Sequence, residues 1–218
     1  MRIAIFGATG QTGLEAVAQA LQKGYDVTAV VRNPDKLAIR DSKLTVVRGD
    51  VMDAASLTPL LEHHDAIVSC LGFPRASPVT GYTDSMKAIV EAMRKNNIRK
   101  LVTMTSWYTD TTTAANGGFF VNWLLVPLIK PVLCNMRAME TFLSEQCQDL
   151  DYTVVRPPGL GKGDLSGNPV SVTEEAYFVK GNKGAHRIPR ADVASFMLSL
   201  LSTSQYNRKM IAMTTAVL

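Results

Sequence analysis

The chain has 218 residues, of which 46% are hydrophobic and 19% are charged, and its formal net charge is +4. These values predict one soluble globular domain over residues 1–218, large enough to bury a substantial core. The modest charge suits an anionic small molecule, and the absence of a run of lysines and arginines argues against a nucleic-acid partner.

The first elements of the chain are a strand, a glycine-rich turn and the start of a helix. The apolar run 2–6 leads into Gly7, Gly10 and Gly13, and a helical pattern covers 13–23. In that order, the glycines suit a sharp turn, a close approach of backbone to phosphates, and tight packing of the helix on the sheet. The N–H groups and positive dipole end of the helix then face an anion. The predicted dinucleotide contacts are Gly7, Thr9, Gly10, Gln11, Thr12 and Gly13.

Strand and helix patterns alternate from there to residue 156. Strands are predicted over 2–6, 26–31, 44–48, 66–69, 100–105 and 152–156. Helices are predicted over 13–23, 54–62, 83–96 and 136–147. Asn97 follows the third helix, where a left-handed cap is common. This alternation predicts an α/β fold, a Rossmann-type doubly wound parallel sheet of order 3-2-1-4-5-6, with ligands at the carboxyl ends of the strands.

The residue that follows the second strand indicates which nicotinamide cofactor is bound. An acidic residue there accepts from the 2′-hydroxyl of NAD, whereas an arginine accommodates the 2′-phosphate of NADP. Here strand 26–31 runs into Arg32, and the next carboxylate is that of Asp35. A guanidinium forms charge-assisted, often bidentate hydrogen bonds with a phosphate, so we expect the cofactor to be NADPH.

The ends of the third and fourth strands supply further candidate nucleotide contacts. Asp50 can accept from the adenine amino group while Val51 packs on the ring. Asp53 is predicted instead to cap the helix that begins near residue 54. After the fourth strand, the residues expected to pass under the ribose are Cys70, Leu71 and Gly72.

The fifth strand ends at Thr105 and Ser106, which are expected near the nicotinamide ribose, with Ser106 as the candidate catalytic residue. Many reductases of this fold pair such a serine with Tyr-x-x-x-Lys, in which the lysine lowers the pKa of the tyrosine. None of the six tyrosines has a lysine four positions later, and no other catalytic set or metal pattern replaces it. The cofactor is therefore expected to carry the chemistry, with an acceptor such as a flavin or a linear tetrapyrrole that takes its proton from solvent.

An apolar stretch covers residues 119–133. It is shorter than the ~20 residues of a membrane-spanning helix, and polar or proline residues interrupt it. We therefore expect no membrane span, and we interpret the stretch as buried or pocket-lining. The candidate substrate-pocket residues are Trp107, Tyr108, Phe119 and Trp123.

After residue 156 the regular alternation weakens. A loop rich in proline and glycine is predicted over 157–167, a helix over 191–201 and a strand over 209–215. The C-terminal part of a doubly wound fold commonly supplies the substrate side. The substrate cleft is therefore expected to be formed largely by 106–135 and 157–190.

The cysteines and histidines form no metal-binding or catalytic pattern. The cysteines are odd in number and lack the close paired spacing of a zinc site: Cys70, Cys134 and Cys147. Reduced cysteines are typical of the cytosol, and the chain begins directly with a strand pattern. We therefore expect a cytoplasmic protein that no signal peptide precedes. His63 and His64 are expected at the surface, and a site role for His186 has no further support. The oligomeric state is left open, and a monomer is compatible with the sequence.

Taken together, these motifs resemble the biliverdin-IXβ reductase/flavin reductase family, an atypical group of the short-chain dehydrogenase/reductase superfamily. The resemblance rests on residues 2–13, 30–32, 49–51, 71–72, 105–106 and 157–158. It implies an NADPH-dependent reductase of flavins, biliverdin-like tetrapyrroles or quinones, with Ser106 beside the nicotinamide. It also implies that the nicotinamide is covered by the loop of Pro157, Pro158, Gly159 and Leu160. Gly159 stands where the family often has a histidine that lines the substrate pocket.

The missing tyrosine–lysine pair also fits a protein that is not an enzyme. An NADPH-binding sensor that resembles the NmrA-like regulators would keep the fold and use segment 119–133 as an exposed patch for a partner protein. An isomerase or dehydratase acting on a sugar would need the tyrosine–lysine pair and a larger C-terminal domain. The leading hypothesis from the sequence is an NADPH-dependent oxidoreductase.

Overall fold

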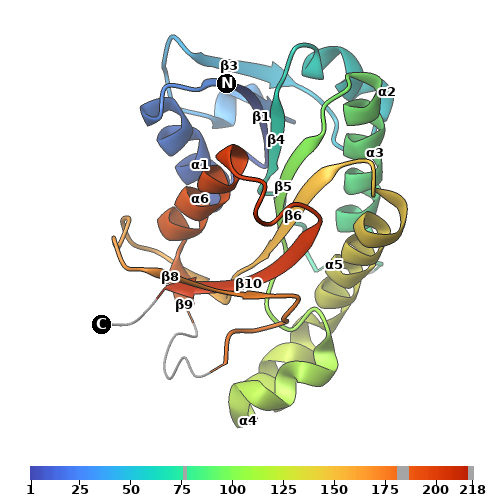
Figure 1. Ribbon diagram of the computed structural model, residues 1–218, viewed down its shortest axis with the longest axis vertical. Coiled ribbons are helices and arrows are strands. Elements are labelled where there is room, and N and C mark those ends of the chain that lie inside the picture. The colour runs from blue at the N-terminus through green and yellow to red at the C-terminus, as the bar shows by residue number, and fades with distance from the viewer. Residues whose placement is uncertain (76–77, 181–186, 216–218) are drawn as a thin grey trace.

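An eight-stranded sheet forms the centre of the computed structural model, which describes residues 1–75, 78–180 and 187–215. Its order is β3-β2-β1-β4-β5-β6-β10-β8 (Figure 1). In chain order its strands are β1 (Arg2–Phe6), β2 (Asp26–Val31), β3 (Leu44–Arg48), β4 (Ala66–Ser69), β5 (Lys100–Met104), β6 (Asp151–Arg156), β8 (Val170–Glu174) and β10 (Lys209–Thr215). A separate parallel pair joins β7 (Gly159–Gly161) to β9 (Arg187–Pro189).

The structure confirms the predicted Rossmann-like fold and the strand order 3-2-1-4-5-6. Every neighbouring pair from β3 to β10 is parallel, and β8 pairs antiparallel with β10 at the outer edge. The sequence analysis did not predict β8, an edge strand of five residues in which only Val170 and Val172 are apolar and most side chains are exposed. β7 also lies within the predicted loop 157–167, so that segment is only partly a loop.

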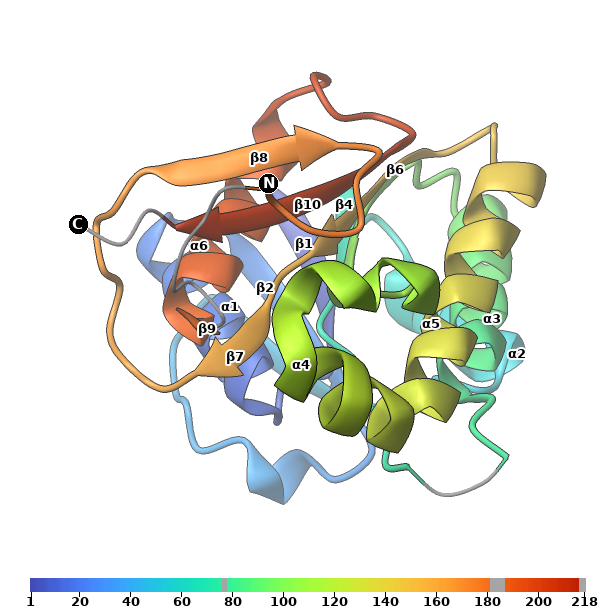
Figure 2. The same cartoon turned by 90° about the horizontal axis from the view of Figure 1, so that it is seen from below.

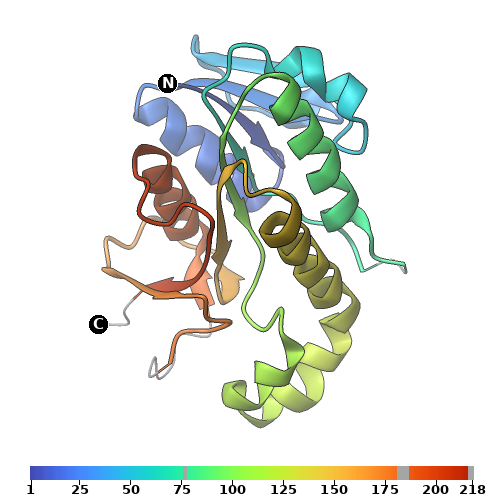
Figure 3. The ribbon, with the colours of Figure 1, turned by 45° about the vertical axis from the view of Figure 1, so that its right-hand side comes forward.

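Helices and short 3₁₀ turns surround the sheet. The helices are α1 (Gln11–Gln22), α2 (Ala54–Leu57), α3 (Gly81–Lys95), α4 (Gly118–Phe120), α5 (Val126–Gln146) and α6 (Arg190–Ser199). The 3₁₀ turns are Pro34–Lys36, Thr58–Leu61, Thr111–Gly117 and Leu200–Ser202. α1 and α6 cover one face of the sheet, while α2, α3 and α5 cover the other (Figures 1 and 3). Asn97 has a φ of 56°, which confirms the predicted left-handed cap after α3.

Alternating residues of the central strand build the two halves of the core. Ile3 and Ile5 lie in the cluster that packs under α1 and α6, whereas Ala4 and Phe6 lie in the cluster under α3 and α5. Successive side chains of a strand point to opposite faces. Because helices cover both faces, the central strands are apolar throughout rather than alternating with polar residues.

The structure departs most from the prediction before α5. This helix begins at Val126 rather than at residue 136, and α4 and a π-helical turn (Val121–Leu125) precede it. Together they form a hook at one end of the molecule (Figure 2). We call residues 118–130 the apolar hook.

The prediction that residues 119–133 are buried or line the pocket is wrong for the apolar hook. Phe119 is 80% exposed and Trp123 is 70% exposed. Stretch 119–133 is helical and mostly apolar, and the protein covers only one side of it, where Val121, Val126, Val132 and Leu133 are buried.

Candidate functional site

A cavity of about 600 Å³ lies where the carboxyl ends of the central strands meet. Cofactor and small-molecule sites commonly measure about 300–1,000 Å³. The predicted cofactor contacts that line the cavity are Gly7, Thr9, Gly10, Gln11, Thr12, Arg32, Asp50, Val51, Cys70, Leu71, Gly72, Thr105, Ser106, Pro157, Pro158, Gly159 and Leu160. These residues follow the ends of six strands, β1 to β6, so the fold brings together segments that lie far apart in the sequence.

The glycine turn after β1 leaves no room for side chains at two positions. Gly7 has a φ of +75°, and a Cβ there would stand 2.5 Å from the carbonyl oxygen of Cys70. A Cβ on Gly13 would overlap the carbonyl oxygen of Gly7. Gly13 is the one predicted cofactor contact that does not line the cavity, and its role is to let α1 pack against the turn.

The N-terminal end of α1 faces the cavity without a side chain that competes for its N–H groups. Gly10 is the N-cap residue and forms no side-chain cap, and the first turn of α1 contains no acidic residue. Unpaired N–H groups and the positive end of the helix dipole favour an anion at such a point. The turn therefore fits the pyrophosphate of a dinucleotide.

Two guanidinium groups line the cavity. Arg32 is exposed at its rim, and none of the ion pairs among the described residues involves it. Arg190, at the start of α6, was not predicted, and its Nη1 donates to the carbonyl oxygen of Gly161 at 2.7 Å. Arg32 remains available for an anionic ligand, whereas Arg190 is held by the backbone of β7.

The end of β3 contributes Asp50 and Val51 to the cavity wall. Asp50 Oδ1 accepts from the backbone N–H of Met52 at 2.9 Å, which fixes the carboxylate. Val51 is nearly buried and offers an apolar surface. Asp53 accepts from the N–H of Ala55 at 2.9 Å and caps α2, as predicted.

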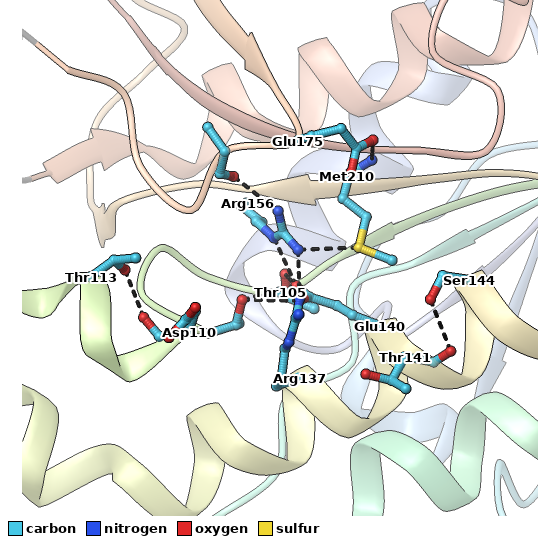
Figure 4. Close-up of polar contacts among 12 residues, drawn as sticks. Thr105, Asp110, Thr113, Arg137, Glu140, Thr141, Ser144, Arg156, Glu175 and Met210 are labelled. Atoms are coloured by element: carbon cyan, nitrogen blue, oxygen red, sulfur yellow. Dashed lines mark hydrogen bonds and ion pairs between the residues drawn. The ribbon is translucent and has the colours of Figure 1, made fainter.

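Thr105 connects the cavity to a buried ion pair (Figure 4). Its hydroxyl donates to Glu140 Oε1 at 2.8 Å, and Arg156 donates to the same carboxylate from Nε at 2.9 Å and from Nη2 at 2.7 Å. Thr109 also donates to Glu140, and the guanidinium of Arg156 lies 4.4 Å from the centre of the Tyr177 ring. Glu140 and Arg156 come from α5 and β6, and no local pattern in the sequence indicated that they meet.

The rest of the cavity wall is apolar and aromatic. It is formed by Val30, Val31, Met52, Phe73, Tyr82, Met104 and Met136. The Phe73 and Tyr82 rings lie edge to face at 5.0 Å, and the N–H of Phe73 donates to the Tyr82 hydroxyl at 3.2 Å. Burial raises the pKa of Tyr82, so its hydroxyl stays protonated at neutral pH. Tyr82 was not predicted, because Met86 rather than a lysine follows it four residues later and no other motif marks it.

The structure places none of the predicted substrate-pocket residues in the cavity wall. Trp107 and Tyr108 are buried in the core, where Tyr108 stacks on Phe178 with 6.0 Å between ring centres. Tyr108 has a φ of 61°, and the chain turns there into the core. Phe119 and Trp123 point to solvent. Among the described residues of the expected cleft, Ser106, 157–160 and Arg190 line the cavity, and 107–135 contribute none of its wall.

Among the described residues, the cysteine and histidine side chains offer no nucleophile or acid–base pair in the cavity. Burial raises the pKa of Cys70 to about 12, so its thiol stays neutral. His63 is exposed, and His64 is half-buried, with its Nε2 2.8 Å from Thr28 Oγ1. His186 lies outside the described residues. No group of three or more potential metal ligands is present in the described part of the chain.

Comparison with known proteins identifies the family to which the chain belongs. The sequence matches the NAD(P)H-binding family over residues 7–204. An uncharacterized chloroplast protein of Arabidopsis thaliana is 28% identical over 188 residues, which are 81% of this chain and 65% of that protein. The photosystem II assembly factor Ycf39 of Synechocystis is 26% identical over 216 residues, or 96% of this chain and 61% of that protein. The chain thus spans less than two thirds of the length of these relatives.

Two solved structures share the fold over nearly the full length. A candidate NADH-flavin reductase of Streptococcus pneumoniae superimposes with a TM-score of 0.78, 20% identity and 99% coverage of both chains. An anaerobillin reductase of Escherichia coli gives a TM-score of 0.77 and 20% identity, covering 100% of this chain and 98% of that one. At this level of identity, the likeness shows the fold alone.

Proposed function

This chain belongs to the NAD(P)H-binding family, and we propose that it is an NADPH-dependent oxidoreductase that reduces a flavin, a linear tetrapyrrole or a quinone. One observation carries the proposal: the glycine turn and the pair Thr105–Ser106 border the same cavity. A dinucleotide whose pyrophosphate lies on the N-terminus of α1 can therefore extend its nicotinamide toward Ser106. The names of the two reductase neighbours support an activity of this kind.

The residues of the chain would bind, orient and shield the reactants. A reduced nicotinamide, when bound, supplies the hydride itself. Ser106 would orient the nicotinamide and the acceptor, and residues 157–160 would cover them. The apolar wall of Phe73, Met104 and Met136 would exclude water from the reacting centre. No general acid from the protein is needed if the reduced acceptor takes its proton from solvent.

The test of this function is steady-state loss of NADPH absorbance with a panel of FMN, riboflavin, biliverdin isomers and small quinones. The expected result is turnover with at least one acceptor. Ser106→Ala should lower kcat more than it lowers the affinity for NADPH, because the hydroxyl is proposed to act at the reacting end. An absence of turnover with the whole panel would contradict the proposal.

The relative named as an assembly factor favours a second candidate function. A non-catalytic, NADPH-sensing regulatory protein would use the same cavity without a hydride acceptor. Tight binding of NADPH combined with no turnover in the acceptor panel would support this sensor and reject the reductase. The two candidates therefore differ in one assay on the same protein.

The preference for NADPH is expected to depend on Arg32. Replacing it with alanine should weaken NADPH binding by about 10- to 150-fold, because a hydrogen bond to a charged group contributes ~1.5–3 kcal/mol. NADH binding should change little, since NADH lacks the 2′-phosphate. Fluorescence titration of both nucleotides gives the two dissociation constants. Arg48→Ala is the matched control, because Arg48 is an exposed arginine at the end of the neighbouring strand β3 and does not line the cavity. An unchanged NADPH/NADH affinity ratio in Arg32→Ala would show that the 2′-phosphate lies elsewhere.

A further inference from the structure

The apolar hook exposes large hydrophobic side chains that the reductase site does not use. They are Phe119, Phe120, Trp123, Leu124, Leu125 and Leu128. Given that a buried aromatic side chain covers ~150–250 Å², their joint exposed area is on the order of 600 Å². The largest apolar patch on an ordinary monomer measures ~300–600 Å² and is often functional. A patch of this size in one short helical segment indicates a surface that another apolar phase covers.

Two exposed cations lie beside this patch. From residue 111 to residue 139, the only charged side chains are Lys130 and Arg137, and no acidic residue lies in that range. Arg75, in the loop after β4, reaches the apolar hook, where its Nη1 lies 3.5 Å from the carbonyl oxygen of Leu128. Arg137 packs over the Tyr177 ring and lies near Glu140. The exposed cations at the patch are therefore Arg75 and Lys130.

We infer that the apolar hook docks on an anionic lipid membrane surface. Exposed phenylalanine, tryptophan and leucine in a helical segment, with lysine and arginine beside them, are typical of segments that lie in the membrane interface. The aromatic side chains would enter the boundary between headgroups and acyl chains, and Arg75 and Lys130 would meet the lipid phosphates. A second copy of the chain fits less well, because a symmetric contact through this patch would bring its cations close together.

The geometry of α5 favours docking over insertion. Among the described residues, one helical stretch, Thr111–Gln146, is long and apolar enough to cross a membrane by length and composition, and 22% of its most apolar part is buried. However, the second half of α5 packs Met136, Met139 and Leu143 into the core beneath the sheet. Spanning would therefore require the domain to unfold. Of this helical stretch, the apolar hook is the part that projects from the body of the molecule (Figures 1 and 3).

Docking would also fix the orientation of the cavity relative to the membrane. The apolar hook follows the carboxyl end of β5, and Arg75, which contacts it, follows the carboxyl end of β4. The cavity opens at the same edge of the sheet. A membrane bound by the apolar hook would therefore lie on the side of the cavity mouth.

Flotation of the full chain with vesicles tests the inference. The protein should float with vesicles of phosphatidylcholine and phosphatidylglycerol, and much less with phosphatidylcholine alone. Trp123 fluorescence should shift to shorter wavelength, and Trp107, which is buried, contributes a constant background. Phe119→Ser/Trp123→Ser should lower partitioning by at least about 100-fold, given ~1.5 kcal/mol or more for each buried aromatic side chain. Lys130→Gln should lower it about fivefold, the equivalent of ~1 kcal/mol per cation.

The control variant is Leu165→Ser, which removes an exposed leucine outside the apolar hook and should leave flotation unchanged. All these side chains are exposed, so thermal unfolding and NADPH binding should match those of the wild type. No flotation of the wild type with anionic vesicles would overturn the inference. Equal flotation of the Phe119/Trp123 variant would do the same. A dimer in sedimentation velocity that this variant converts to a monomer would assign the patch to a second copy instead.

Discussion

Gly10→Asp is expected to lower the affinity for NADPH by at least about 100-fold while the protein stays folded. The new carboxylate would stand at the N-terminus of α1, where the pyrophosphate is expected to bind. Two like charges ~4 Å apart repel by about 4 kcal/mol at an effective dielectric constant of ~20, and 2.7 kcal/mol already corresponds to 100-fold. The backbone of Gly10 is extended, with φ −79° and ψ 160°, a conformation that any residue adopts. A Cβ there meets only the carbonyl oxygen of Gly7, at 3.2 Å.

Stability should move in the opposite direction from binding. Aspartate is among the preferred N-cap residues, so Gly10→Asp should leave the free energy of unfolding unchanged or raise it by a few tenths of a kcal/mol. Gly10→Asn is the matched control, because asparagine caps equally well and has nearly the same shape without the charge. Nucleotide titration and thermal unfolding of both variants separate the effect of the new charge on nucleotide affinity from the effect of the added side-chain volume. Equal losses of affinity in the two variants would attribute the effect to crowding, and unchanged affinity in both would place the phosphates elsewhere.

The parts of the fold that the sequence predicts well are those encoded locally. The apolar run 2–6, the spacing of Gly7, Gly10 and Gly13, and the helical pattern after them form one continuous signal. Parallel strands connected by helices allow few topologies, so the order of the first six strands followed from the alternation. Seventeen of the predicted cofactor contacts border the cavity, because in this fold the residues just after the strands lie at one edge of the sheet.

The burial of the apolar hook is the feature that the sequence predicts wrongly. Hydrophobicity tells which side chains gain from leaving water, but not whether the fold provides a surface to cover them. Pro127 and Pro131 were interpreted as interruptions, yet both lie within α5. Pro127 stands in the first turn of α5, directly after the π-helical turn, where the helix geometry is already irregular. The helix therefore starts earlier than predicted and carries Phe119 and Trp123 away from the cavity.

The remaining site residues depend on contacts between distant elements. Tyr82 lies in the first turn of α3 and Arg190 begins α6, and neither lies in a motif that marks it for the cavity. Glu140 and Arg156 resemble ordinary charged residues in the sequence, which are mostly exposed. Tertiary packing makes them a fully buried pair, and periodicity carries no information on such a pairing.

Glu140→Leu is expected to lower the free energy of unfolding by about 3–5 kcal/mol. The substitution would leave the guanidinium of Arg156 buried, at 1% exposure, without its counter-charge. It would also remove the acceptor of the Thr105 and Thr109 hydroxyls. Urea unfolding of the variant and the wild type measures the difference.

The double variant Glu140→Leu/Arg156→Met should recover most of this stability, because apolar residues of similar volume often replace a buried ion pair at little cost. Asp149→Leu breaks the exposed Arg94–Asp149 pair, which has the same 2.7 Å separation as Arg156–Glu140. It should cost only ~0–1 kcal/mol. An equal loss of unfolding free energy in Glu140→Leu and Asp149→Leu would mean that burial does not increase the cost of breaking the ion pair. Since Thr105 both lines the cavity and donates to Glu140, the double variant should regain stability more completely than it regains NADPH affinity.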